Sequence, residues 1–599
     1  MSHDTGVDVA RLLGMSRPAL DQLFRSSPAG GIPTGEAHGT VLLARGAGLS
    51  EAAAALARVA AWKGKVFDPG RGELLNRITP FGVAAVRAKV YRGPSRLDGK
   101  ECTVLDYSRT SFVARRIRDE IREIAPGVYL GIVYWGRHKV LNFALSLRGS
   151  PGSPGTYGSP DPTASLAEAA RAPHQVAVTI RAVVPEDRVA EVRRRLDEAG
   201  RKGSAGEVVP FSELVGVHFA RLVLVPAGTD LAGEPVPASI VYMSEVDAPL
   251  DAHLADLVRK AGSGVGEVFG HCEGYPVAGA PDAARVAWLR DHCVPSAAFY
   301  VNTVGRGLRQ ILQEARLREA IETFLDQRAA GPSGSELPQD PATVRAEIQR
   351  FVTGRPDLAW AGSPAARPGL RWRVRQAAHR VAVPLAGLAL LPVAVFALPV
   401  WAVLLRWHER RDAPNRERPD PEHVARLAAC EDFAAQNPFT AVGFVKSGRF
   451  RRMTLTGVLF VVDYGVRHLF NRGSLAGVKT IHFARWLFID DKRRVVFVSN
   501  YDGSLESYMD DFVDKVAWGL NAVFSNGHGY PRTRWLVRDG AEDEQAFKFF
   551  LRCHQVPTEV WYSAYDTLTT HHIDTNARIR AGLFGDLGPA ETQAWLALF

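Results

Sequence analysis

The chain has 599 residues, more than a single hydrophobic core normally organises, so two to four domains are expected. Hydrophobic residues make up 46% of the chain and charged residues 23%, a composition typical of globular proteins rather than disordered chains. The net charge of +9 indicates either contact with an anionic surface or an arginine-rich composition. Zinc-finger spacing and basic–aromatic ladders are absent from the sequence, so nucleic acid is not expected as a partner.

Cysteine usage and the first residues indicate a cytoplasmic location. The five cysteines are scattered and contain no CxxC pair, so neither a disulfide framework nor a cysteine zinc site is predicted. The opening MSHDTGVDVARLLG has no basic segment followed by an apolar run, so no signal peptide is expected.

Residues 1–147 are predicted to form a helical lead-in followed by a small β domain. A small antiparallel barrel or curved sheet with one helix is the expected shape. Asp119, Glu120 and Arg122 would then form a solvated face of that helix. The helices are expected at 50–62 and at SFVARRIRDEIREI (111–124), and the strands at 62–67, 76–93, 100–108, 127–135 and 140–147.

The Trp-x-Gly-Lys at Trp62–Lys65, before this strand ladder, resembles the lipocalin-like domains of uncharacterised bacterial proteins. The resemblance covers about residues 60–147 and implies a small apolar ligand or lipid inside the barrel. A filled barrel without a cavity is the alternative.

Two segments are predicted to be linkers because they are rich in Gly, Ser and Pro. They are residues 148–173 and 329–370, the second with one short helix around ATVRAEIQRFV (342–352). They separate the β domain from a module at 174–328 and a module at 430–599 with a C-terminal extension.

The two later modules are predicted to be repeats. VHFARL (217–222) recurs as IHFARW (481–486), and Ser244–Pro276 aligns without a gap on Ser499–Pro531. The order in each module reads strand, helix, strand, strand, helix, strand, with VGEVFGHCEGYP (265–276) as the fourth strand of the first. The fold class expected is α+β, with tandem ferredoxin-like repeats.

Two such repeats resemble the dimeric α+β barrel superfamily, whose haem-binding members include dye-decolorising peroxidases and chlorite-dismutase-like proteins. SNYDG (499–503) is the nearest match to the peroxidase motif, although Ser499 stands where that motif has Gly. The resemblance implies a pseudo-dimeric barrel in which Asp502 acts as distal acid and Arg485 stabilises charge. It also implies haem on a histidine that the motif does not place; the candidates are His528, His554, His571 and His572.

Several residues in these repeats have structural interpretations as well. On a regular strand His482 and Arg485 face opposite ways, and Arg485 and Arg221 would pair with a helix carboxylate such as Asp511 or Asp256. Asp502 is equally suited to a turn or a helix cap. In a haem-free enzyme, Tyr501, Asp502 or His528 would be acid or base, so the candidate catalytic residues are Asp502, Arg485, His482 and Tyr501.

An apolar segment lies between the repeats, within residues 371–412. Residues 381–405 carry no charge, enough for a membrane helix, but contain Pro384, Pro392 and Pro399. Arginines flank both ends, which favours keeping both ends on the cytoplasmic side. We expect a kinked in-plane segment or re-entrant hairpin, with a buried core hairpin and a single span as alternatives.

The expected function is therefore a membrane-associated protein that binds a small apolar ligand or lipid, with peroxidase-like oxidoreductase activity as the catalytic option. The alternatives are a non-catalytic carrier at the cytoplasmic membrane surface and a haem-free enzyme of the same superfamily.

Overall fold

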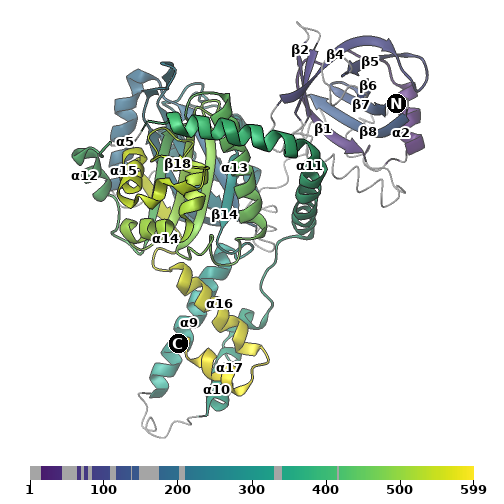
Figure 1. Ribbon diagram of the computed structural model, residues 1–599. Coiled ribbons are helices and arrows are strands. Elements are labelled where there is room, and N and C mark those ends of the chain that lie inside the picture. The colour runs from purple at the N-terminus through teal and green to yellow at the C-terminus, as the bar shows by residue number, and fades with distance from the viewer. Residues whose placement is uncertain are drawn as a thin grey trace. The chain divides into compact units, whose positions relative to one another are not determined.

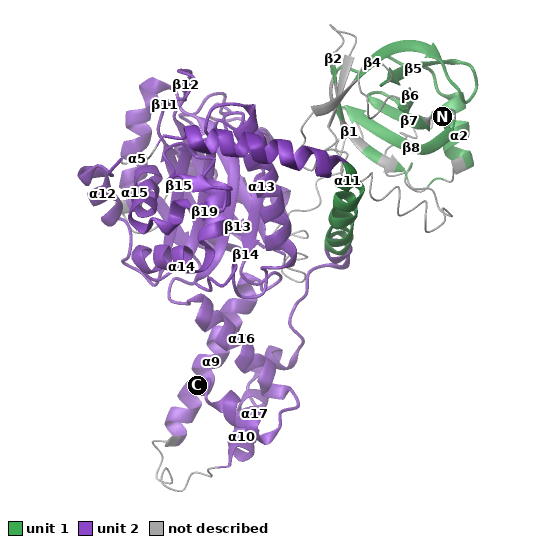
Figure 2. Ribbon diagram, viewed as in Figure 1, with its two compact units in different colours: residues 1–161, 375–392 green, residues 162–374, 393–599 purple. Residues whose placement is uncertain are grey.

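Figure 1 shows the computed structural model of the chain, which divides into two compact units (Figure 2). Unit 1 comprises residues 1–161 and 375–392, and unit 2 comprises residues 162–374 and 393–599. The structure describes residues 12, 15, 17–42, 64–68, 73–77, 84–107, 117–136, 138–147, 174–201, 209–247, 249–329, 340–413 and 417–599. The predicted helix at 50–62 and linker at 148–173 lie outside these residues.

Unit 1 contains a closed antiparallel barrel of eight strands in sequence order, so the predicted small barrel is confirmed. It closes where β1 pairs with β8, for example Gly39 opposite Leu145. The helix α2 (Arg17–Ser26) packs Leu20 and Phe24 into an apolar cluster with strand residues. The strands are β1 (Gly35–Leu42), β2 (Gly64–Asp68), β3 (Glu73–Arg77), β4 (Ala84–Pro94), β5 (Glu101–Asp106), β6 (Ile117–Ala125), β7 (Val128–Trp135) and β8 (His138–Leu147).

The helix predicted at 111–124 is wrong in its described part, because residues 117–125 form strand β6. Asp119, Glu120 and Arg122 are buried there rather than solvated. Asp119 pairs with Lys65 at 2.8 Å, and Arg122 pairs with Asp98 at 2.7 Å. These partners lie on other segments, and they stabilise charges in a strand whose local pattern is helical.

Unit 2 is built around two four-stranded antiparallel sheets. Sheet B has the order β20 (Val560–Ser563), β10 (Val217–Val225), β13 (Ser239–Val246), β9 (Val176–Val183). Sheet D has the order β14 (Ser296–Val301), β16 (Ile481–Ile489), β17 (Arg494–Asp502), β15 (Gln436–Phe444). The short hairpins β11–β12 (Gly228–Thr229, Pro235–Val236) and β18–β19 (Thr533–Arg534, Arg538–Asp539) lie outside these sheets.

The sheets face each other through an apolar layer and carry helices on their outer faces, in four layers. Val223, Met243, Leu487 and Val498 belong to the layer between the sheets. The helices α5 (Val189–Arg201), α7 (Leu250–Phe269) and α8 (Asp282–Asp291) pack on sheet B. The helices α13 (Arg449–His468), α14 (Leu505–Phe524) and α15 (Glu544–His554) pack on sheet D. The mixed α+β class is therefore confirmed.

Each sheet takes its fourth strand from the other half of the chain. β14 belongs to the first half but pairs with β16, and β20 belongs to the second half but pairs with β10. Just before crossing, each of these segments touches the first strand of its own half, at Ile180–Cys293 and Ala441–Gln555. The two halves are therefore one interlocked unit.

The fourth strand predicted at 265–276 is wrong, because α7 runs to Phe269 and turns follow it. In the second half, the sequence pattern predicts strands at 437–448, 480–490 and 493–502 and helices at 450–470 and 506–524, and all five elements form there.

A helical subdomain extends from one end of the sheets (Figure 1). Its core includes Leu317, Ile348, Leu358, Ile579 and Trp595. The predicted short helix at 342–352 is confirmed as α10. The elements are α9 (Leu308–Ala329), α10 (Pro341–Thr353), η4 (Pro356–Gly362), α16 (Thr570–Phe584) and α17 (Pro589–Leu596).

The apolar segment is a single helix, α11 (Leu370–Arg411), and it is long and apolar enough to cross a membrane by length and composition. Only 6% of its most apolar window is buried. The buried core hairpin is therefore wrong, since the segment does not enter a core. α12 (Pro421–Ala428) follows it.

Candidate functional site

His482 and Asp502 form a buried hydrogen-bonded pair at the end of sheet D that adjoins the helical subdomain. His482 Nε2 lies 2.7 Å from Asp502 Oδ1. The other oxygen, Oδ2, accepts hydrogen bonds of 2.8 Å from the backbone N–H and the hydroxyl of Thr570, the first residue of α16. Asp502 therefore stabilises the N-terminus of α16, where a carboxylate is favoured by the helix dipole. The helix that follows Asp502 directly, α14, is capped by Ser504 instead.

A second pair, His218 and Asp247, repeats this arrangement in sheet B. His218 Nε2 lies 3.0 Å from Asp247 Oδ1, and Asp247 Oδ2 accepts a 2.6 Å hydrogen bond from the N–H of Leu308, the first residue of α9. The two pairs differ in the remaining ring nitrogen. His218 Nδ1 lies 3.0 Å from the hydroxyl of Tyr565, whereas His482 Nδ1 has no hydrogen-bond partner among the described residues.

An irregularity in each strand turns both histidines toward the space between the sheets. The register of β16 shifts between Ile481 and Phe483, and that of β10 shifts between Val217 and Phe219. The His482 ring consequently lies 5.3 Å from the ring of Phe219 in the opposite sheet. The prediction that His482 and Arg485 face opposite ways assumed a regular strand and is wrong.

Arg485 crosses the space between the sheets rather than pairing with a helix. It donates to the carbonyls of Val178 at 2.6 Å and Ser244 at 2.9 Å, and it pairs with Glu245. The prediction of a helix carboxylate partner is wrong, since Asp511 pairs with Lys515 on its own helix. Arg485 holds the two sheets together.

Arg221 makes the reciprocal connection from sheet B to sheet D. It donates to the carbonyls of Phe439 at 2.9 Å and Ser499 at 3.0 Å, and to the side chain of Asn500. Asp256, its predicted partner, binds Arg259 and Lys260 instead. Asn500 stands where the first half has Glu245, and it donates to Glu245 at 3.2 Å.

Tyr501 is buried under the helices of sheet D, on the other face from the histidine pairs. Its ring stacks on Tyr508 with centroids 4.0 Å apart. Burial raises the pKa of Tyr501, so its hydroxyl stays protonated. The structure therefore does not bring Tyr501 together with His482 and Asp502.

The histidines that the superfamily resemblance offered to haem do not converge on Asp502. His528 is exposed, and His554 binds the carbonyl of Phe550 at 2.8 Å at the end of α15. His571 is exposed, and His572 completes the capping box of α16 with Thr569. The layer between the sheets beside Asp502 is filled by aromatic rings and by the two arginines. These residues do not fit a haem group at that place.

The chemistry open to this end of the sheets is proton transfer at His482. Asp502 fixes the ring through Nε2, so Nδ1 is the nitrogen that can accept a proton. Burial raises the pKa of Tyr565, which lies between the two histidine rings, well above its ordinary value.

Sequence reasoning missed His218, Asp247, Tyr565 and Thr570 as parts of this site. For His218 and Asp247 the sequence does contain a signal: VHFARL repeats as IHFARW, and Asp247 aligns on Asp502. Tyr565 and Thr570 lie in no repeated motif, because they belong to the segment that contains the exchanged strand β20 and the start of α16.

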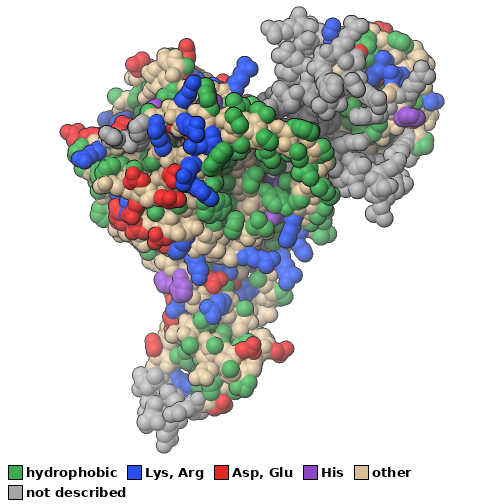
Figure 3. Space-filling model, in the orientation of Figure 1, with side chains coloured by type: hydrophobic (Ala, Val, Ile, Leu, Met, Phe, Trp, Pro, Cys, Tyr) green, Lys and Arg blue, Asp and Glu red, His purple; other side chains and the backbone are tan. Residues whose placement is uncertain are grey.

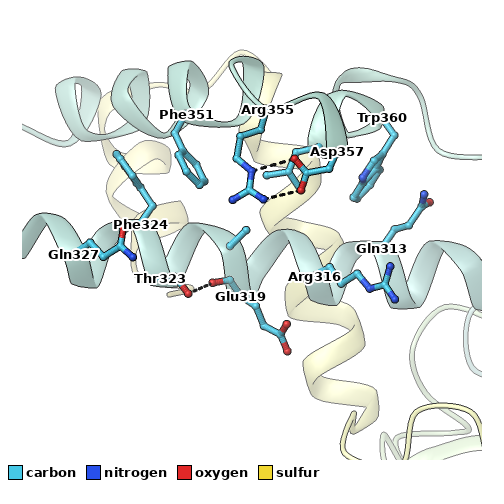
Figure 4. A pocket seen from close by; sticks show the side chains of 12 residues that line it. Gln313, Arg316, Glu319, Thr323, Phe324, Gln327, Phe351, Arg355, Asp357 and Trp360 are labelled. Atoms are coloured by element: carbon cyan, nitrogen blue, oxygen red, sulfur yellow. Dashed lines mark hydrogen bonds and ion pairs between the residues drawn. The ribbon is translucent and has the colours of Figure 1, made fainter.

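A separate cleft of about 500 Å³ lies in the helical subdomain between α9 and α10–η4 (Figure 4). Phe324 and Phe351 stack on one side of it with centroids 4.5 Å apart, and Arg355 pairs with Asp357 at 2.7 Å on the other. It contains none of the residues that the sequence singled out.

The second candidate site is an exposed apolar surface, here called the apolar face. It consists of seven residues of α11 and two of α13: Val393, Val395, Phe396, Leu398, Val400, Val403, Leu404, Met453 and Val461, each between 42% and 79% exposed. Figure 3 shows hydrophobic side chains gathered over this part of the surface. A surface this apolar is typical of protein or membrane contact.

The C-terminal part of α11 is anchored to α13 and its surroundings. Trp401 Nε1 donates to Thr454 Oγ1 at 3.1 Å. Glu409, 2% exposed, accepts hydrogen bonds from the N–H groups of Trp535 and Leu536. Asp412 pairs with Arg451 at 2.7 Å. The exposed apolar residues are therefore held in place on a rigid support.

No family model matches the sequence, and no curated protein matches it. Among solved structures, a crystal structure of a protein from Thermomonospora curvata covers 22% of this chain and 88% of its own, with 20% identity and a TM-score of 0.18. A TM-score that low assigns neither fold nor function. The resemblances to the α+β barrel superfamily and to lipocalin-like domains accordingly stay predictions.

Proposed function

We propose that this protein is a monotopic membrane protein that rests on the cytoplasmic face of a bilayer through α11 and α13 and binds a small apolar ligand or lipid in its N-terminal barrel. The observation that carries the proposal is the exposure of α11, because only 6% of its most apolar window is buried. Such a surface is stabilised when a leaflet covers it.

The connections of α11 argue for an in-plane helix over a single span. The elements before it, α10 and η4, pack with α9, and the residue after it, Asp412, pairs with Lys446 near sheet D. Both ends therefore belong to unit 2. A helix that crossed the hydrocarbon core of about 30 Å would separate them.

The two halves of the chain provide an internal comparison. α5 and α13 occupy equivalent places, each following the first strand of its half. α5 exposes ion pairs, such as Arg194 with Glu191, whereas α13 exposes Met453 and Val461. Because the same position is polar in one half and apolar in the other, the apolar residues of α13 are not a requirement of the fold.

Flotation of the purified full-length protein with phospholipid vesicles tests the proposal. The variant Phe396→Glu/Val400→Glu places two charges on the apolar face. It is expected to weaken vesicle binding at least tenfold, because placing charged side chains in the apolar part of a leaflet costs free energy. The matched control is Phe433→Glu/Val277→Glu, which changes two exposed apolar residues elsewhere in unit 2 and should bind as wild type. Wild-type protein that stays with the soluble fraction contradicts the proposal.

A second candidate function is acid–base catalysis at His482 without haem, favoured by its pairing with Asp502 and by its unpaired Nδ1. His482→Gln is expected to lower any turnover by roughly 10²–10⁴-fold. His218→Gln breaks the other pair and is the matched control, expected to keep most of the activity. A Soret band after incubation with haem would support the peroxidase-like alternative instead.

A further inference from the structure

We infer that the leaflet that receives the apolar face is rich in anionic phospholipid, whose phosphate groups are bound by the arginines at the two ends of α11. This inference rests on the proposed membrane function and specifies its partner. It is carried by the charges of α11 and by the way the structure uses them.

The charged residues of α11 are almost all positive. From Leu370 to Arg411 it contains seven arginines and one acidic residue, Glu409. Glu409 is buried, pairs with Arg406 and accepts from backbone N–H groups of the β18–β19 hairpin region. Its charge is therefore compensated within the protein and does not offset the remaining arginines.

The arginines at the N-terminal end face solvent. Arg371, Arg373 and Arg375 are exposed and make no ion pair or hydrogen bond with described residues. Three unpaired guanidinium groups in five residues, directly before an exposed apolar stretch, offer bidentate donors at the depth of lipid phosphates.

The arginines at the C-terminal end lie beside a tryptophan. The Arg411 guanidinium stacks on the Trp407 ring at 3.6 Å from its centroid, and Arg410 is exposed next to it. Trp407 is 47% exposed, on the same side of the helix as Val403 and Val400, which lie about one and two turns away. An aromatic ring between an apolar face and basic groups is typical of the bilayer interface.

The apolar stretch between the two arginine groups decides the class of anion. Residues 381–405 span about 37 Å of helix without a charge, at about 1.5 Å per residue. Nucleic acid offers phosphates but no apolar phase for this stretch. An anionic phospholipid leaflet offers both, with phosphates at its surface and an apolar phase directly beneath them.

The experiment compares flotation with phosphatidylcholine vesicles and with vesicles that also contain phosphatidylglycerol. Wild-type protein is expected to prefer the anionic vesicles, and the preference should fall with added salt. The variant Arg371→Gln/Arg373→Gln/Arg375→Gln is expected to lose about fivefold per arginine, roughly 100-fold in all, on anionic vesicles only. The control Arg193→Gln/Arg194→Gln/Arg195→Gln removes the same charge from α5 and should bind as wild type.

The outcomes separate the two claims. Equal binding to both vesicle types, insensitive to the arginine substitutions, overturns this inference and leaves membrane binding intact. Failure to bind either vesicle type overturns the proposed function and this inference with it. Self-association without vesicles that Phe396→Glu/Val400→Glu abolishes would show that a second copy of the chain covers the apolar face, which also overturns both.

Discussion

The centre of unit 2 holds an unbalanced set of buried charges. Arg221, Arg485 and Glu245 are each at most 2% exposed, and the position equivalent to Glu245 in the second half is Asn500. Two cations therefore share one carboxylate. Burial lowers the pKa of Arg221 to about 10, with Glu245 acting in the opposite direction. The carboxylate of Glu245 is thus the main compensation for both arginines.

We expect Glu245→Gln to destabilise unit 2 by roughly 3–5 kcal/mol, because it leaves two buried guanidinium groups without an anion. The midpoint of urea unfolding, followed by circular dichroism, measures the change.

The control for this prediction is a double-mutant cycle. Arg485→Met alone leaves Glu245 facing Arg221 only, and the pair Arg485→Met/Glu245→Gln removes one charge of each sign. The double variant should lose less stability than the two single losses together. Strict additivity would mean that the two side chains do not interact.

Because of Glu559, the free energy of unfolding is expected to depend on pH near neutrality. Burial raises its pKa to about 7, and its carboxylate accepts a hydrogen bond from the N–H of Leu224 at 3.1 Å. Since the folded pKa is raised above the unfolded value, its contribution to stability is present at low pH and is lost as pH rises through about 7.

Wild-type protein should lose at most about 1.4 kcal/mol of unfolding free energy per pH unit from this group between about pH 5 and pH 7. Glu559→Gln should remove that part of the slope. Urea unfolding at several pH values measures it, and an unchanged slope in the variant would contradict the prediction.

At the scale of elements, α9 and α16 are each held by the carboxylate of one histidine pair. Asp502→Asn weakens the acceptor of the Thr570 N–H and hydroxyl, so the first turn of α16 should exchange its amide hydrogens faster while α9 is unaffected. Asp247→Asn should do the reverse through Leu308. Hydrogen exchange read by mass spectrometry measures both, and equal effects on both helices in either variant would contradict this assignment.

Elements with a strong local pattern could be predicted from the sequence, and elements decided by distant partners could not. The strand at 481–489 and the helix at 449–468 have clear periods, and both form. The charged period of 117–125 favours a helix, yet Lys65 and Asp98 accommodate its charges in a barrel strand.

The same distinction applies to the site. The sequence identifies His482 and Asp502 as candidates, but their contact depends on a register shift in β16. The regular alternation of faces assumed for a strand does not predict that shift. Tyr565 and Thr570 follow β20, four residues long, whose place in sheet B is decided by pairing with β10 more than 330 residues earlier.

At the scale of the whole molecule, unit 2 depends on β20. A chain that ends after Gln555 lacks β20 and leaves the edge of β10 unpaired, so we expect it to aggregate. A chain that ends after Gly588 keeps β20 and α16 and loses only the last helix, α17, and should remain largely monodisperse. Size-exclusion chromatography with light scattering distinguishes them, and a monodisperse shorter chain would contradict the role given to β20.

The exchange of strands also has a consequence in time. During synthesis β10 is completed long before β20, and α11 is made between them. The edge of β10 in the nascent first half is therefore unpaired while the apolar helix α11 leaves the ribosome. Long-range pairing of this kind is slow and exposes aggregation-prone surface. Under the proposed membrane function, early capture of α11 by a bilayer would keep the unfinished chain apart from its neighbours until β20 is made, so the bilayer would assist folding as well.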